Sequence, residues 1–198
     1  MAYAAPAGNI QVAIDATKSG EPVNAMLFGG YMEPATTPVW AEMLNDRKFA
    51  NPITTALPAA AANNSPMRRF APASFKAVGP AGTVEMDTVR PFVGQHSPRV
   101  QLGGAEARGI QHAKLRMAAG KTYEGRVYLA GDPGAQVVVR LVWGAGAGDS
   151  QTIAIPPLAR DYKKFPFKFT PAADTQDGRL EILGTGSGTF HVGTVSLM

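Results

Sequence analysis

The sequence contains no cysteine, which excludes disulfide frameworks, thiolate metal sites and cysteine nucleophiles. Histidine is scarce as well, and the 3 histidines are too scattered to suggest a transition-metal cluster. No apolar stretch reaches the roughly 18–20 residues that a membrane-spanning helix needs, so we expect no membrane partner. Charged residues make up only 17% of the chain and hydrophobic residues 45%, which argues for a folded core and against global disorder.

The basic residues form no recognisable nucleic-acid surface. The net charge is +4, but the basic side chains are scattered and no basic run alternates with aromatic residues. Two glycine-dense stretches, residues 144–149 and 184–188, lead into predicted strands rather than helices. A phosphate loop needs a helix N-terminus behind it, so these stretches are predicted hairpin turns. Neither nucleic acid nor a nucleotide is therefore an expected partner.

Residues 1–56 form a leader with its own pattern. An alternating segment at 10–14 and an apolar segment at 25–28 each predict a strand. Thr37 before Pro38 is a helix start signal, and the apolar spacing that follows predicts a short amphipathic helix over 38–47. The leader is too short to close a core, and its strand 25–28 would expose an edge. We therefore expect it to pack on another element or to pair with a second copy as a dimer.

The remainder of the chain is predicted to be a linker followed by an all-β domain. Residues 57–66 are small, polar and bounded by proline, which indicates a linker. Residues 67–198 contain 10 short runs typical of strands, separated by turn residues. This spacing predicts a two-sheet antiparallel β-sandwich of the jelly-roll type. The predicted strands are Phe75–Val78, Thr83–Met86, Arg99–Leu102, Gly109–Met117, Thr122–Ala130, Ala135–Trp143, Gln151–Ile155, Tyr162–Thr170, Arg179–Leu183 and Thr189–Leu197.

Several polar and aromatic side chains are predicted to point away from the core. A sugar-binding surface combines an aromatic platform, which packs on C–H faces, with polar side chains that bind hydroxyl groups. If the strands that carry these residues share one sheet, they form a polar groove with one ring. The alternative is a solvated sheet face with weak cross-strand ion pairs. The candidate residues are Glu124, Arg126 and Tyr128, with His112 and Lys114 on the run before them and Arg140 on the run after.

Trp143 is a further candidate with two interpretations. It ends a strand whose alternate residues are apolar, which favours a place in the core. It also stands beside Gly144 at the start of a turn, where it would serve as an exposed binding platform.

Two parts of the sequence together resemble a known enzyme family. The segment Leu27-Phe-Gly-Gly-Tyr-Met-Glu33, followed by Glu42-Met-Leu44 and Arg47-Lys-Phe49, resembles the start of the family 51 glycoside hydrolases, the α-L-arabinofuranosidases. Residues 109–131 and 185–198 look like the family 4/9-type carbohydrate-binding module that is inserted in some members.

The resemblance implies a fragment of a larger enzyme. In that family a (β/α)₈ barrel, which needs about 250 residues, carries both catalytic glutamates. Retaining hydrolysis needs two carboxylates about 5–5.5 Å apart, and no pair of this kind is recognisable in the sequence. Glu33 matches the glutamate that ends the first barrel strand and contacts sugar in the family. We therefore expect this chain not to be an enzyme.

The same resemblance implies a function in polysaccharide binding. We expect a non-catalytic module of a secreted or periplasmic, bacterial, plant-cell-wall-degrading hydrolase. Its expected ligands are arabinoxylan, arabinan, xylan or β-glucan. The alternative is a structural sandwich that braces the missing barrel and binds no sugar, which the low aromatic content of 8% favours. The resemblance permits a structural calcium ion, for which Asp87, Glu106 and Asp132 are oxygen ligands of the right kind.

Overall fold

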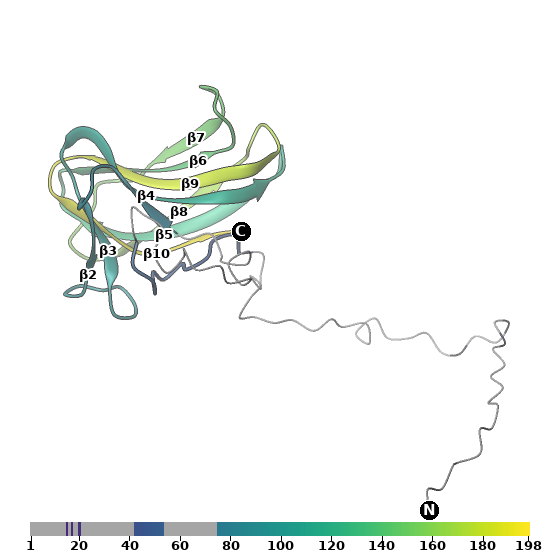
Figure 1. Ribbon diagram of the computed structural model, residues 1–198, viewed down its shortest axis with the longest axis horizontal. Helices are drawn as coiled ribbons and strands as arrows, with labels where there is room; N and C mark the ends of the chain where they lie inside the picture. Colours follow the sequence, from purple (N-terminus) through teal and green to yellow (C-terminus); the bar gives the residue numbers. More distant parts are fainter. Residues whose placement is uncertain (1–14, 16, 18–19, 21–41, 54–74) are drawn as a thin grey trace, which may run out of the picture.

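The computed structural model describes residues 15, 17, 20, 42–53 and 75–198 (Figure 1). Several predictions of the leader lie outside these residues, among them the strands at 10–14 and 25–28, the linker at 57–66, Glu33 and the proposed dimer contact. The described residues contain no helix, and hence none that is long and apolar enough to cross a membrane.

The domain is built entirely from strands. The alternation of apolar and polar residues predicted each of them, and the observed ends differ from the predicted ends by a few residues. The strands are β1 Phe75–Val78, β2 Val84–Asp87, β3 Ser97–Gln101, β4 Gly104–Met117, β5 Tyr123–Gly131, β6 Ala135–Val142, β7 Ser150–Ala154, β8 Lys163–Phe169, β9 Thr175–Gly186 and β10 Thr189–Leu197.

The strands form two five-stranded antiparallel sheets that face each other, as the sequence predicted. Sheet 1 has the order β1-β4-β9-β6-β7, and sheet 2 has the order β2-β3-β10-β5-β8. The chain changes sheet between β4 and β5 and again between β5 and β6. Consecutive strands of this region therefore lie in opposite layers, with β4 and β6 above β5 in Figure 1.

The core lies between the two sheets, where the inward-pointing side chains of both meet. Phe167 and Phe169 of β8 are buried while Lys164 and Lys168 between and beside them are exposed, as the alternation predicts. Burial of one such side chain contributes about 1.5–3 kcal/mol. The most deeply buried core residues also include Val100, Ile110, Val127, Leu129, Val139, Leu141, Leu180, Ile182, Phe190 and Leu197.

One irregularity in β4 changes which side chains face the core. Lys114 has a left-handed backbone conformation with φ of 61°, and the pairing of β4 with β9 shifts between His112 and Leu115. An extra residue of this kind reverses the alternation of the strand. Ile110 and His112 before the bulge and Leu115 after it therefore all point inward.

Residues 42–53 close one edge of the sandwich. β3 pairs with β10 only over residues 189–191, which leaves the outer edge of the last residues of β10 free. The N–H of Met43 donates to the carbonyl oxygen of Leu197 at 2.8 Å, and the N–H of Val195 donates to that of Arg47 at 3.2 Å. The segment thus takes the place that a longer β3 would occupy.

The predicted helix over 38–47 is wrong for its described part. Residues 42–47 are extended and then turn, with a left-handed conformation at Asp46 (φ 53°). The cause is tertiary: Leu44 and Phe49 enter the core, and backbone groups of Met43 and Arg47 bond to β10 instead of forming helical hydrogen bonds. These contacts outweigh the local helical spacing.

Candidate functional site

The predicted site residues do not lie together. Their placement in one groove required β4, β5 and β6 to share a sheet, but β5 lies in sheet 2 and the other two strands in sheet 1. Glu124, Arg126 and Tyr128 therefore belong to the outer face of sheet 2, and Arg140 belongs to the outer face of sheet 1.

Two of the three residues of β5, Glu124 and Tyr128, contact neighbouring side chains. Glu124 and Lys168 form an exposed ion pair at 3.0 Å, the kind of weak cross-strand contact that the alternative interpretation expected. The ring of Tyr128 packs on Phe92, with ring centroids 4.7 Å apart. Tyr128 is thus half-buried under the loop between β2 and β3 and does not present a free ring face.

The sequence predicted that His112 lies on the surface, and this prediction is wrong because the bulge at Lys114 turns the side chain inward. His112 is 1% exposed, accepts the N–H of Asn45 at Nε2 and packs on Phe75. Trp143 is 7% exposed and belongs to the core cluster, which selects the core interpretation over the exposed platform. Both side chains are therefore packed in the interior, and Trp143 also contributes to the lining of the groove described next.

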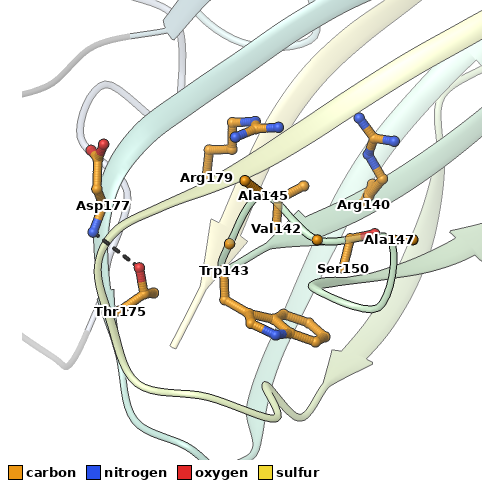
Figure 2. A pocket seen from close by; sticks show the side chains of 11 residues that line it. Arg140, Val142, Trp143, Ala145, Ala147, Ser150, Thr175, Asp177 and Arg179 are labelled. Carbon is orange, nitrogen blue, oxygen red and sulfur yellow. Dashed lines mark hydrogen bonds between the residues drawn. The ribbon is translucent and has the colours of Figure 1, made fainter.

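An open groove of about 660 Å³ lies on sheet 1, where β6 and β9 meet the β6–β7 hairpin (Figure 2). Arg140 and Arg179 lie along one side of it, Thr175 and Asp177 lie at the start of β9, and Ser150 starts β7. The glycine-dense turn predicted at 144–149 supplies the backbone at the other end of the groove.

The two arginines are held in place by one buried carboxylate. Arg140 Nε donates to Glu181 Oε2 at 2.7 Å, and Arg179 Nε donates to Oε1 at 2.6 Å. Glu181 is 6% exposed, whereas each arginine is 38% exposed. The two guanidinium groups compensate the Glu181 carboxylate for the water that it loses on burial, and their bonds to it fix the planes of both guanidinium groups. Arg140 Nη2 also lies 2.6 Å from Oε2, so both the Nε and the Nη2 of Arg140 face the carboxylate.

Two apolar side chains, the nearly buried Leu183 and the half-buried Val138, lie beside these charges on the same face. Leu183 of β9 pairs with Gly109 of β4 and Val138 of β6, two residues along from the pair Glu181 and Arg140 and so on the same face. Leu183 is 8% exposed but lies outside the core cluster between the sheets. The outer face of sheet 1 thus has fixed hydrogen-bond donors next to a small apolar area, of which Val138 is the more exposed part. Such a face suits a ligand with oxygen atoms along one edge and C–H groups along the other.

Sequence reasoning found Arg140 but missed its partners. The alternation in Arg179-Leu180-Glu181 does place both charged side chains on one face of a strand. The sequence gives no signal that β9 pairs with β6, because the two strands are more than 30 residues apart in the chain. The role of Glu181 depends on that pairing.

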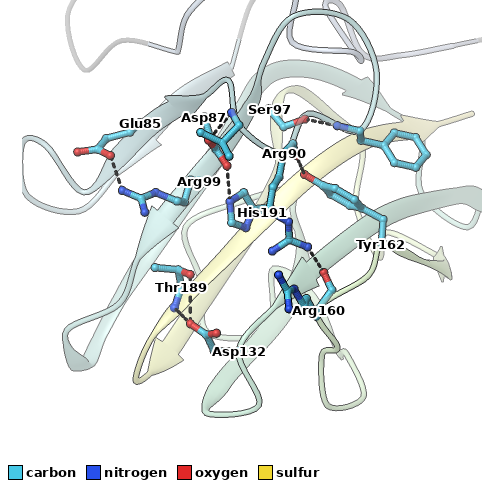
Figure 3. Close-up of polar contacts among 12 residues, drawn as sticks. Glu85, Asp87, Arg90, Ser97, Arg99, Asp132, Arg160, Tyr162, Thr189 and His191 are labelled. Atoms are coloured by element: carbon cyan, nitrogen blue, oxygen red, sulfur yellow. Dashed lines mark hydrogen bonds and ion pairs between the residues drawn. The ribbon is translucent and has the colours of Figure 1, made fainter.

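A second polar cluster covers the outer face of sheet 2 (Figure 3). His191 of β10 and Asp87 of β2 approach with Nε2 and Oδ2 2.9 Å apart, and Tyr162 donates to the carbonyl oxygen of Arg90 at 3.0 Å. Glu85 and Arg99 form an ion pair beside them at 2.7 Å.

The ionisation of this cluster follows from its burial. Burial holds the pKa of His191 below its ordinary value, although the Asp87 carboxylate opposes that effect. Burial acts to raise the pKa of Asp87, but hydrogen bonds from Val89 and His191 outweigh it and the pKa is lowered. Asp87 is therefore an ionised acceptor and His191 a neutral donor through Nε2. Burial also raises the pKa of Tyr162.

The oxygen ligands considered for calcium do not converge. Asp87 bonds to His191, Glu106 pairs with Arg108 at 2.9 Å, and Asp132 accepts the N–H of Thr189 at 2.7 Å. Within residues 42–53 and 75–198 no group of three or more metal-ligating side chains is assembled. The residues named from the sequence do not fit a calcium ion.

No protein-family model matches the chain, and no curated protein sequence matches it. Solved structures do. The arabinose-bound MgGH51 α-L-arabinofuranosidase aligns with a TM-score of 0.54 at 14% identity, over 80% of this chain and 26% of the enzyme. The module TmCBM61 in complex with β-1,4-galactotriose aligns at 0.49 and 11% identity, over 79% and 97%. A xylan-binding domain from Paenibacillus barcinonensis aligns at 0.47 and 17% identity, over 62% and 83%.

These identities are low, and the likeness to the arabinofuranosidase concerns the fold and only about a quarter of that enzyme. The chain thus shares its two-sheet β-sandwich with part of a family 51 arabinofuranosidase.

Proposed function

We propose that this chain is a non-catalytic carbohydrate-binding module and that the groove of sheet 1 holds a hemicellulose-type polysaccharide. The observation that carries the proposal is the outer face of sheet 1, where guanidinium groups fixed by Glu181 lie beside the apolar side chains of Val138 and Leu183. A sugar ring has hydroxyl groups around its edge and C–H groups on its faces, so it can use both features. Shallow sites of this kind bind in the micromolar to millimolar range, about 4–8 kcal/mol.

The host of the module is part of the same proposal. The resemblance of the leader to family 51 glycoside hydrolases and the fold shared with the MgGH51 enzyme support an arabinofuranosidase as the parent. On this proposal the leader 1–56 is the start of the parent enzyme's β domain and barrel, of which residues 42–53 pack on the sandwich, and residues 57–66 are the linker. The protein acts outside the cytoplasm as a secreted or periplasmic bacterial protein. Arabinoxylan, arabinan, xylan and β-glucan are the ligands to be tried.

A structural role as a brace for the missing barrel is the second candidate. Large hydrophobic side chains exposed on the described part of the chain are few, namely Val89, Phe92 and Met198, and the aromatic ring among them packs on Tyr128. A face without an aromatic platform is unusual for a sugar-binding surface and favours this candidate.

Affinity gel electrophoresis distinguishes the two functions. The full chain is run in native gels that contain arabinoxylan, xylan, arabinan, β-glucan or galactan. The proposal expects retardation by at least one polymer, and expects substitution of Arg179→Gln to reduce it while Tyr128→Ala on sheet 2 does not. No retardation by any polymer, for a chain that melts cooperatively, would support the brace. Loss of retardation only in Tyr128→Ala would place the site on sheet 2.

A further inference from the structure

We propose that the groove of sheet 1 selects acidic polysaccharides and that Arg140 and Arg179 bind the carboxylate of a uronic acid residue, a specificity that rests on the proposed carbohydrate-binding function. The geometry for such binding is present before any ligand arrives. Two guanidinium groups that share Glu181 present their remaining N–H donors on one sheet face, and a planar fork of donors matches a carboxylate.

The charge of this row of side chains is positive. Glu181 neutralises one of the two arginines that it contacts, so one positive charge remains. The register continues the row across sheet 1 from Arg140 and Glu181 to Gln111 of β4 and then to Lys76 of β1, which is exposed and adds a second positive charge. An anionic chain laid across the strands would meet these groups in succession.

Asp177 is the opposing charge. It is exposed and lines the groove near the start of β9, where it would repel a carboxylate. Removal of the Asp177 carboxylate should therefore strengthen the binding of an acidic sugar but not the binding of hydroxyl groups. Substitution of Asp177 thus separates the two kinds of recognition.

The outer face of sheet 1 also lacks the usual means of binding a neutral sugar. Trp143 is the one aromatic residue among the described residues that line the groove, and it is 7% exposed and belongs to the core cluster, so it presents little ring surface to a ligand. Stacking on a ring would bind neutral and acidic sugars alike, but donors that are themselves charged strengthen bonds to an anionic acceptor. The composition of the face thus favours the acidic ligand.

The test compares one polymer with and without its carboxylates. The full chain is run in affinity gels that contain glucuronoxylan or the same polymer after reduction of its carboxylates to hydroxymethyl groups. We expect binding to glucuronoxylan to be about tenfold tighter, the order expected for an added charge-assisted hydrogen bond. We also expect the difference to shrink when salt is raised from roughly 0.05 to 0.5 M, because exposed charges are then screened.

Three variants locate the effect. Arg140→Gln should lose most of the preference for glucuronoxylan, and Asp177→Asn should increase it. Lys164→Gln removes the same charge from β8 of sheet 2 and should leave the preference unchanged. If Arg140→Gln does not melt cooperatively, the double variant Arg140→Gln with Glu181→Gln replaces the ion pair by an amide pair and is used instead.

The outcomes separate this proposal from the broader one. Equal binding of both polymers would overturn the selection of acidic sugars and leave a neutral carbohydrate-binding module. Equal retardation by poly-glutamate, or equal losses in Lys164→Gln and Arg140→Gln, would also overturn it, because the binding would then be unspecific attraction between a basic protein and a polyanion. Binding of neither polymer nor of any neutral one would overturn both proposals.

Discussion

Glu42 shows how one side chain can fix a whole segment. Its Oε1 accepts the N–H groups of Leu44 at 3.1 Å and Leu197 at 3.0 Å. Its Oε2 accepts the hydroxyl of Ser196 at 2.7 Å and the guanidinium of Arg47 at 3.0 Å. The residue is 8% exposed, so these donors replace the water that the carboxylate loses on folding.

Removal of this carboxylate should be costly. Glu42→Ala leaves the buried N–H of Leu197 and the hydroxyl of Ser196 without an acceptor, and we expect the free energy of unfolding to fall by about 2–4 kcal/mol. Chemical denaturation measures the change. Glu85→Ala, which breaks an exposed ion pair, is the control and should cost less than about 1 kcal/mol. Equal losses in the two variants would show that the contacts of Glu42 do not stabilise the fold.

His191 should make the domain sensitive to mild acid. Its pKa in the folded protein lies below the ordinary 6.5, so the folded state binds the proton less readily than the unfolded state. This contribution to stability is full above pH 6.5 and is lost as the pH falls through 6.5 towards the folded pKa. Asp87, whose pKa lies below 3.8, loses its own contribution only at still lower pH.

The melting temperature between pH 7.5 and 5 tests this account. It should fall for the wild-type chain and fall less for His191→Gln, whose amide can still donate to Asp87 but does not titrate. The same slope in both proteins would mean that another group controls the pH dependence.

The orientation of single residues was the hardest property to predict. Alternation counted backwards from the buried Leu115 puts His112 on the outside, yet the left-handed Lys114 adds one residue and turns His112 into the core. Lysine does not favour this conformation, so the bulge has no signal in the sequence. In a regular strand the alternation predicted the inward face correctly, as Phe165, Phe167 and Phe169 of β8 show.

At the scale of elements, local pattern predicted strands but not their partners. Alternation reports which residues share a face, and it located all the strands from β1 to β10. It does not report which strands are neighbours, because pairing is decided by contacts between distant parts of the chain. β5 carries a polar face like those of β4 and β6, but it lies in the other sheet. The residues of the predicted groove therefore lie in two different sheets.

The segment 42–53 should behave as an integral element of the sandwich. Phe49 is 1% exposed and packs edge-on against Phe75, with ring centroids 5.0 Å apart. We expect Phe49→Ala to lower the free energy of unfolding by about 3–5 kcal/mol, the usual cost of a cavity of this size.

Denaturation monitored by circular dichroism gives this value, with Phe92→Ala as the control. Phe92 is 37% exposed, so its truncation should cost clearly less. A small loss for Phe49→Ala would mean that the segment is a loosely attached extension.

At the scale of the whole molecule, the two outer faces of the sandwich differ. The outer face of sheet 2 carries the loop with Phe92, and residues 42–53 close the edge of its strand β10, whereas sheet 1 has the groove between β6, β9 and the β6–β7 hairpin. This difference is why we propose the groove of sheet 1 as the ligand site.

The central claim is that sheet 1 binds polysaccharide, and a titration followed by amide chemical shifts tests it most directly. Glucuronoxylan oligosaccharides are added to the ¹⁵N-labelled full chain, and the shifts are mapped on the fold. The account predicts that the largest changes fall on residues 140–150 and 175–183, with saturation in the micromolar to millimolar range. Changes confined to β5 and β8, or no changes at any accessible concentration, would contradict it.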